Sequence, residues 1–233
     1  MRAAIAVFLV WLYAGDLVRF IKVQSAPVAL INAVPSLALS LIGTALAFAF
    51  TAIVLLDVGG RLQPDWRPRS LVHAAVAALV FIDFSIISSR LTPILPEVRV
   101  AAVIQGLADA ASEAATLDQI PTDRRAFEEW ARESGGPAPL FKEGNAVGTW
   151  HVEVRENCIG PAEFAGNSPA GTLIYCVAPN RRRAWITAVA IPLGKRFGQA
   201  DIISTQGAFV GDVEVISEPR RRNEQPVWDP PTP

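Results

Sequence analysis

The chain has 233 residues, of which 51% are hydrophobic, and its formal net charge is −1 at pH 7. A net charge so close to zero gives no support for nucleic-acid binding, and we expect no nucleic-acid partner. Residues 1–95 carry seven Lys/Arg and four Asp/Glu (7 − 4 = +3), whereas residues 96–233 carry 14 and 18 (14 − 18 = −4). The sequence therefore predicts two regions, a transmembrane region over 1–95 and a folded domain over 96–218, followed by a tail.

The first apolar segment follows Met-Arg and covers residues 3–14, with three charged residues within the next eight positions. We expect an uncleaved, slightly short transmembrane helix over residues 3–22. An amphipathic anchor lying in the membrane plane is the second interpretation. A signal peptide has a similar pattern, but no small-x-small cleavage site follows the run.

The second apolar segment, residues 36–56, contains 21 residues without a charge. About 20 residues are needed to cross the hydrocarbon core, and a single segment can satisfy its backbone there only as a helix. Residues 27–34 extend the apolar run and are expected near the interface. Small residues at helical spacing let helices approach closely, so we expect interhelical contacts, within this chain or with other subunits. They are Ser40, Gly43, Thr44 and Ala47.

The third segment, residues 71–92, is apolar as far as Ile82 apart from His73 and then becomes polar. Asp83 lies near its middle, where a carboxylate costs about 2.5–3.5 kcal/mol on insertion scales. Asp83 is therefore expected to be protonated, paired or turned toward protein, and we interpret it as an interhelical contact. A proton relay would need several such groups. His73 alone does not make a cofactor site.

The orientation follows from the arginines of the 57–70 loop, because short cytoplasmic loops are enriched in Lys and Arg. This loop is expected inside, which places residues 96–233 on the periplasmic side of a bacterial inner membrane. On that oxidising side the two cysteines, Cys158 and Cys176, are expected to form a disulfide.

The second region combines helix and strand patterns. Amphipathic periodicity predicts a helix over 97–117, and a possible cap at Thr122 or Asp123 predicts a short one ending near Arg132. Strand patterns without intervening helices predict an antiparallel sheet, and hence an α+β domain. The expected strands are 150–155, a hairpin of 172–178 with 184–191, and a second hairpin of 201–204 with 208–216. Alternation turns Trp150 inward and His151 outward.

Two basic triplets and a proline-rich tail could contact a partner. Arg181, Arg182 and Arg183 lie in a turn between strands, and Arg220, Arg221 and Arg222 precede Trp228. The tail, residues 219–233, is expected to lack regular structure unless a partner orders it. The arginines could also simply be solvated. Otherwise they would contact acidic lipid or an acidic protein surface, which arginine binds through its planar fork.

The order of the segments resembles type IV pilin-like proteins over residues 71–216: a membrane helix, a variable loop, an antiparallel sheet and a late cysteine pair. The family's cleavage motif, a Gly followed by Phe with Glu four residues further on, is absent, and Phe81-Ile82-Asp83 does not match it. We therefore assign no functional residue of this chain from the resemblance.

No motif indicates catalysis. Residues 166–171, Gly-Asn-Ser-Pro-Ala-Gly, differ from the Gly-x-Ser-x-Gly nucleophile turn, and the cysteine and histidine spacing matches no zinc pattern. We expect no enzyme and no cofactor. The sequence favours an accessory subunit of a larger membrane complex, such as a respiratory or photosynthetic one, with other membrane subunits and the lipid bilayer as partners. The alternative is a stand-alone pilin-like or ligand-sensing surface protein.

Overall fold

The computed structural model describes residues 2–60, 67–89, 94–116, 118–192, 194–203 and 210–214. The chain forms two compact units. The first comprises Met1–Val100, Ala138–Gly148 and Ala190–Asp201, and the second comprises Ala101–Pro137, Thr149–Val189 and Ile202–Pro233. Two later segments of the chain thus belong to the same unit as the N-terminal helices, an arrangement that the sequence did not indicate.

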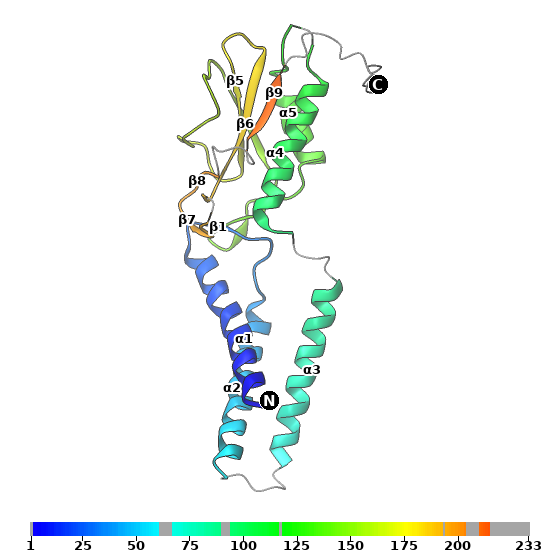
Figure 1. Ribbon diagram of the computed structural model, residues 1–233, viewed down its shortest axis with the longest axis vertical. Helices are drawn as coiled ribbons and strands as arrows, with labels where there is room; N and C mark the ends of the chain where they lie inside the picture. The colour runs from blue at the N-terminus through cyan, green and yellow to red at the C-terminus, as the bar shows by residue number, and fades with distance from the viewer. Residues whose placement is uncertain are drawn as a thin grey trace, which may run out of the picture. The chain divides into compact units, whose positions relative to one another are not determined.

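The N-terminal helices are α1 (Arg2–Ser25), α2 (Leu37–Val58) and α3 (Arg67–Ser89) (Figure 1). Within the described ranges, α1 and α2 are long and apolar enough to cross a membrane, and α3 has 23 residues. The segment expected as a helix over residues 3–22 therefore lies within a 24-residue apolar helix.

The three helices share one buried core. It contains Ala6, Leu9 and Tyr13 from α1, Ala47, Phe50 and Val54 from α2, and Val76 and Leu79 from α3. The outward surfaces are also apolar, since Trp11 is 71% exposed and Phe81 is 73% exposed. Arg2 forms an ion pair of 2.9 Å with Asp57, so the start of α1 lies beside the end of α2. The two helices are therefore antiparallel.

A small sheet completes the first unit. Its strands are β1 (Val28–Leu30), β2 (Leu140–Lys142), β3 (Asn145–Ala146) and β7 (Phe197–Gly198), in the order β3-β2-β1-β7. Ala29 lies opposite Phe141 on one side and Phe197 on the other, both antiparallel. Residues 27–34, expected to extend the apolar run near the interface, thus contain a strand, and its partners are distant in sequence.

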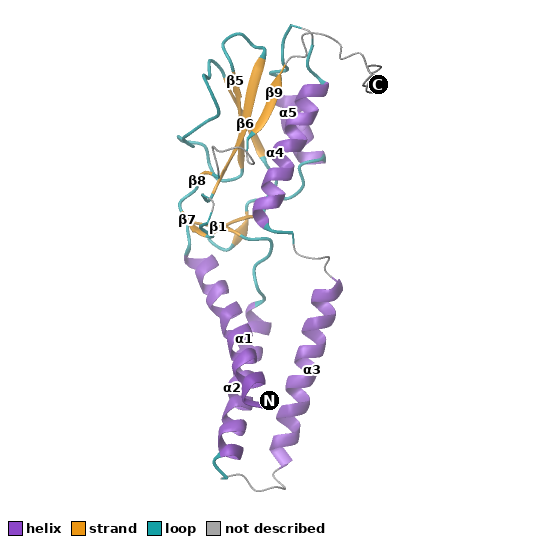
Figure 2. Ribbon diagram, viewed as in Figure 1, coloured by secondary structure: helices purple, strands orange, loops and turns teal. Residues whose placement is uncertain are grey.

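The second unit contains most of α4 (Pro96–Glu113) and all of α5 (Arg124–Glu133), whose N-cap Asp123 accepts a hydrogen bond from the Arg125 N–H. Its sheet has the strand order β4-β5-β6-β8. Figure 2 labels the strands β5, β6, β8 and β9 and the helices α4 and α5. The strands are β4 (His151–Arg155), β5 (Thr172–Val177), β6 (Arg183–Ala190) and β8 (Asp201–Ile202), and β9 (Gly211–Glu214) also pairs with β6. The predicted α+β composition is confirmed.

The prediction of a purely antiparallel sheet was wrong at β4, which runs parallel to β5 with His151 opposite Thr172 and Arg155 opposite Cys176. Parallel neighbours need a connection of a dozen or more residues, and residues 156–171 provide 16. The hairpin of β5 and β6 is antiparallel, as predicted. The sheet is consequently mixed.

The prediction that residues 201–204 and 208–216 pair with each other as a hairpin was also wrong for the described residues. Both β8 and β9 pair with β6, and Gly211 of β9 lies opposite Ile186. A Cβ atom added to Gly211 would come within 3.1 Å of Ile104 and 3.0 Å of Ala108 on α4, so the strand packs directly on that helix. Residues 204–209, between the two strands, lie outside the described residues.

The two faces of this sheet have different covers. On one face the Phe127 ring of α5 contacts the Tyr175 ring of β5, with centroids 4.6 Å apart. On the other face, the connection 156–171 is hydrogen-bonded to Arg155. Trp150 and Val152 are buried and His151 is exposed, as the alternation predicted. The connection thus occupies the position that a helix takes in an ordinary parallel crossover.

Candidate functional site

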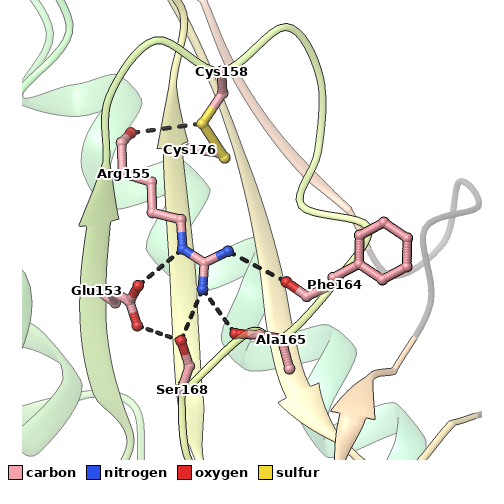
Figure 3. Close-up of a disulfide and its surroundings, with 7 residues drawn as sticks. All are labelled: Glu153, Arg155, Cys158, Phe164, Ala165, Ser168 and Cys176. Atoms are coloured by element: carbon pink, nitrogen blue, oxygen red, sulfur yellow. Dashed lines mark hydrogen bonds and ion pairs between the residues drawn. A yellow bond between two sulfur atoms is a disulfide. The ribbon is translucent and has the colours of Figure 1, made fainter.

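The crossover loop, residues 156–171, is covalently attached to the sheet. Cys158 and Cys176 form a disulfide, with their Cα atoms 5.6 Å apart (Figure 3). Cys158 lies three positions beyond Arg155, the last residue of β4, and Cys176 lies opposite Arg155 on β5. The predicted cysteine pair is confirmed. It fixes the start of the loop to the neighbouring strand.

Arg155 holds the far part of the same loop (Figure 3). Its Nη2 donates to the carbonyl of Ala165 at 2.8 Å and to Ser168 Oγ at 2.8 Å, and its Nη1 donates to the carbonyl of Phe164 at 3.2 Å. Its Nε donates to Glu153 Oε1 at 2.8 Å. The guanidinium therefore uses its fixed fork of donors to tie three loop residues to the strand.

Glu153 completes this network by accepting a second hydrogen bond, from the hydroxyl of Ser168. Partial burial acts to raise the pKa of the Glu153 carboxyl. The hydrogen bonds from Ser168 and Arg155, together with the guanidinium charge, outweigh burial and lower the pKa below its ordinary value. Glu153 is therefore ionised at neutral pH and provides the charge that orients Arg155. The strand alternation placed both residues on one face, but it did not reveal the loop that they hold.

The surface of the crossover loop is unusually apolar. Ile159 is 98% exposed and Phe164 is 74% exposed. In Figure 3 the Phe164 ring points away from the guanidinium that its own carbonyl contacts. Among the described residues of the second unit, these are the exposed large hydrophobic side chains. The loop is thus a fixed support for two apolar groups.

A polar contact joins α1 and α3. The Tyr13 hydroxyl donates to Asp83 Oδ2 at 3.3 Å, so Asp83 does contact another helix of this chain. A Cβ atom added to Gly43 would lie 2.6 Å from Cγ of the Tyr13 ring. Tyr13 therefore contacts both neighbouring helices. Tyr13 was not among the predicted interhelical contacts, although a hydroxyl within an apolar run is a recognisable signal.

The small residues of α2 face the inside of the first unit. Ser40, Gly43 and Ala47 are buried, and Thr44 is half-buried with no hydrogen-bond partner for its Oγ1 among the described residues. His73 of α3 lies edge-on to Phe50 of α2, with ring centroids 5.2 Å apart. The close-packing face of α2 is thus occupied by this chain's own helices.

The described basic triplet is largely neutralised by acidic neighbours. Arg181 pairs with Glu156 at 3.4 Å, and Arg183 pairs with Asp212 and Glu214 at 3.2 Å each. Arg183 also lies over the ring of Trp185, 5.2 Å from its centroid. Arg182 forms no ion pair within the described part of the chain. Arg220, Arg221, Arg222 and Trp228 lie outside the described residues.

No group of three or more His, Cys, Asp or Glu side chains within the described ranges is arranged to hold a metal ion. No family model, no curated protein and no solved structure matches the chain.

Proposed function

We propose that this chain is a non-catalytic accessory subunit of a larger multi-subunit membrane complex, of the energy-transducing class, with its second unit outside the cytoplasm. The observation that carries the proposal is the two-sided character of α3. One side of α3 packs within this chain through Val76 and Leu79, and its Asp83 accepts the hydrogen bond from Tyr13.

The other side of α3 supports a partner helix. Ala74, Ala77 and Ala78 are exposed at spacings of three and four. Exposed alanines on a helix permit the close approach of another helix.

Two independent features support the proposed orientation. Residues 57–70, which run from the end of α2 to the first turn of α3, carry Arg61, Arg67 and Arg69, and these favour the cytoplasmic side. Strand β1 lies between α1 and α2 and pairs with residues 140–142 and 197–198 from the later chain. The connection between α1 and α2 is therefore at the same end of the helices as those later residues. The Arg2–Asp57 ion pair is at the opposite end. The two features agree.

The test is the size of the native particle. The native membrane is extracted in mild detergent and fractionated by size, and the chain, 25.0 kDa by itself, is followed by immunoblotting. We expect co-migration with fixed partners in a much larger particle. A small, homogeneous particle containing only this chain would contradict the proposal and favour the stand-alone surface protein.

A matched pair of variants tests the role of α3. Ala77→Leu places a larger side chain on the exposed alanine face and should release the chain from the large particle. Ala45→Leu makes the same change at an exposed alanine of α2 and should leave the particle intact. Equal behaviour of the two variants would remove α3 from the proposed interface.

A further inference from the structure

The second unit displays its exposed large apolar side chains on one loop. Ile159 and Phe164, 98% and 74% exposed, are five positions apart in the crossover loop. Elsewhere among the described residues of that unit the large apolar side chains are buried or half-buried. Concentrated exposure of large apolar groups on a folded surface marks an interaction site more often than scattered exposure does.

Each exposed side chain lies directly beside an anchor. Ile159 follows Cys158, whose disulfide reaches Cys176 on β5. The carbonyls of Phe164 and of the next residue, Ala165, both accept hydrogen bonds from Arg155. The backbone beneath both apolar groups is therefore held in place before any partner arrives. Preorganisation of this kind lowers the entropy lost on binding.

The charge of the loop indicates which partner fits it. Residues 156–171 contain two acidic side chains and no Lys or Arg. Glu156 is paired with Arg181 at 3.4 Å, whereas exposed Glu163 forms no ion pair with any described residue. A carboxylate next to Phe164 would be repelled by an anionic lipid surface. A second copy bound with this loop on the two-fold axis would bring two Glu163 side chains together.

We propose that the crossover loop docks onto another protein subunit, inserting Ile159 and Phe164 into an apolar pocket bordered by a Lys or Arg that pairs with Glu163. This inference rests on the proposed function, since it names the contact that the second unit makes in the complex. The charge pair orients the docking, and the apolar pair provides most of its strength.

The experiment uses the full chain in its native membrane. Phe164→p-benzoylphenylalanine keeps an aromatic ring and allows photo-cross-linking, and the attached peptide is sequenced by mass spectrometry. We expect one protein adduct, joined at a segment that has apolar residues and a nearby Lys or Arg. In that background Ile159→Ser should lower the adduct yield roughly tenfold or more, as expected for a contact at the centre of an interface.

The contribution of the Glu163 charge is tested by two matched charge-reversal variants. Glu163→Lys should also suppress the adduct, whereas Glu129→Lys, at an exposed site on α5, should not. Reversing the partner's basic residue should restore the adduct in the Glu163→Lys chain. Because Ile159, Glu163 and Glu129 are all exposed, their substitution should leave the disulfide and the thermal midpoint unchanged. This control separates lost docking from misfolding.

The remaining outcomes overturn the inference. Adducts to lipid alone, to a second copy of this chain, or to many unrelated proteins would each contradict it, as would equal effects of the two charge reversals. Sizing of the same extract keeps the two proposals distinct. If the particle is large but the adduct yield is unchanged by Ile159→Ser and Glu163→Lys, the docking proposal is refuted and the accessory-subunit proposal stands. A particle that contains this chain alone refutes both proposals.

Discussion

Tyr13 links three helices through one side chain. Its hydroxyl contacts Asp83 on α3, and its ring packs against Gly43 on α2. A carboxyl group in an apolar helix needs a polar partner, and this hydrogen bond provides one for Asp83. Hydrogen bonds between membrane helices contribute modestly in measured cases, because partners are also found in the unfolded state.

A double-mutant cycle measures this contact. Tyr13→Phe keeps the ring on Gly43 and removes only the hydroxyl, and Asp83→Leu removes the acceptor. We expect a coupling free energy of about 0.6–1.7 kcal/mol, from unfolding in mixed micelles of the single and double variants. Additive single effects would show that the 3.3 Å contact does not stabilise the bundle.

The carboxyl of Glu153 predicts a pH dependence of the second unit. Its pKa is lowered in the folded chain, so ionised Glu153 stabilises the fold above its unfolded pKa of about 4.3. This stabilisation is lost as the pH falls through the folded-state pKa. Glu153→Gln should therefore lower the thermal midpoint at pH 6, and the difference from the parent chain should shrink as the pH falls below the unfolded pKa of about 4.3.

Circular dichroism of both chains across this pH range is the measurement, with Glu129→Gln as a control outside the Arg155 network. A difference between parent and Glu153→Gln that stays constant with pH would show that Glu153 contributes packing rather than charge.

At the scale of elements, the approach of α1 and α2 depends on one missing side chain. A Cβ atom on Gly43 would overlap the Tyr13 ring, whereas one on Gly15 of α1 would meet nothing within 4 Å. Gly43→Ala should destabilise the bundle by about 1–3 kcal/mol through overpacking. Gly15→Ala should be neutral or stabilising by up to about 1 kcal/mol.

Unfolding of the two variants in parallel, under the same micelle conditions, provides the comparison. Because the substitution is identical, a difference between them reports on the helix contact. Equal effects would mean that α1 and α2 separate readily at this point.

Local patterns predicted most elements but not their partners. The uncharged run of 36–56 is sufficient to predict α2, and alternation is sufficient to predict β4. Nothing in the three residues of β1 distinguishes a strand from an interfacial segment, because its partners lie more than 100 residues later. The direction of β4 is likewise nonlocal, although the 16-residue connection to β5 permitted a parallel pairing.

The candidate sites show the same limit. Cysteine count predicted the disulfide, and the cost of burying a charge predicted a partner for Asp83. Tyr13 is 70 positions from Asp83, so no periodicity could connect them. The loop that Arg155 holds depends on the parallel pairing, and an antiparallel interpretation of the sheet could not show it.

At the scale of the whole molecule, the orientation can be tested by cysteine labelling. The native cysteines are joined in a disulfide, so an added thiol is the reactive one. A membrane-impermeant maleimide should label Asn145→Cys, on β3, in intact cells. It should label Gly59→Cys, at the end of α2, only after the membrane is permeabilised. The reverse pattern would invert the proposed topology.

The small sheet of the first unit also sets an order of biogenesis. Val28 of β1 lies opposite Gly198 of β7, so the ribosome adds 170 residues (198 − 28) between the two partners. At typical synthesis rates this takes on the order of ten to thirty seconds. For most of that interval α1 and α2 are already made, while β1 has an unpaired edge. A nascent chain released before residue 197 would keep that edge open and be a natural target for chaperones and membrane proteases.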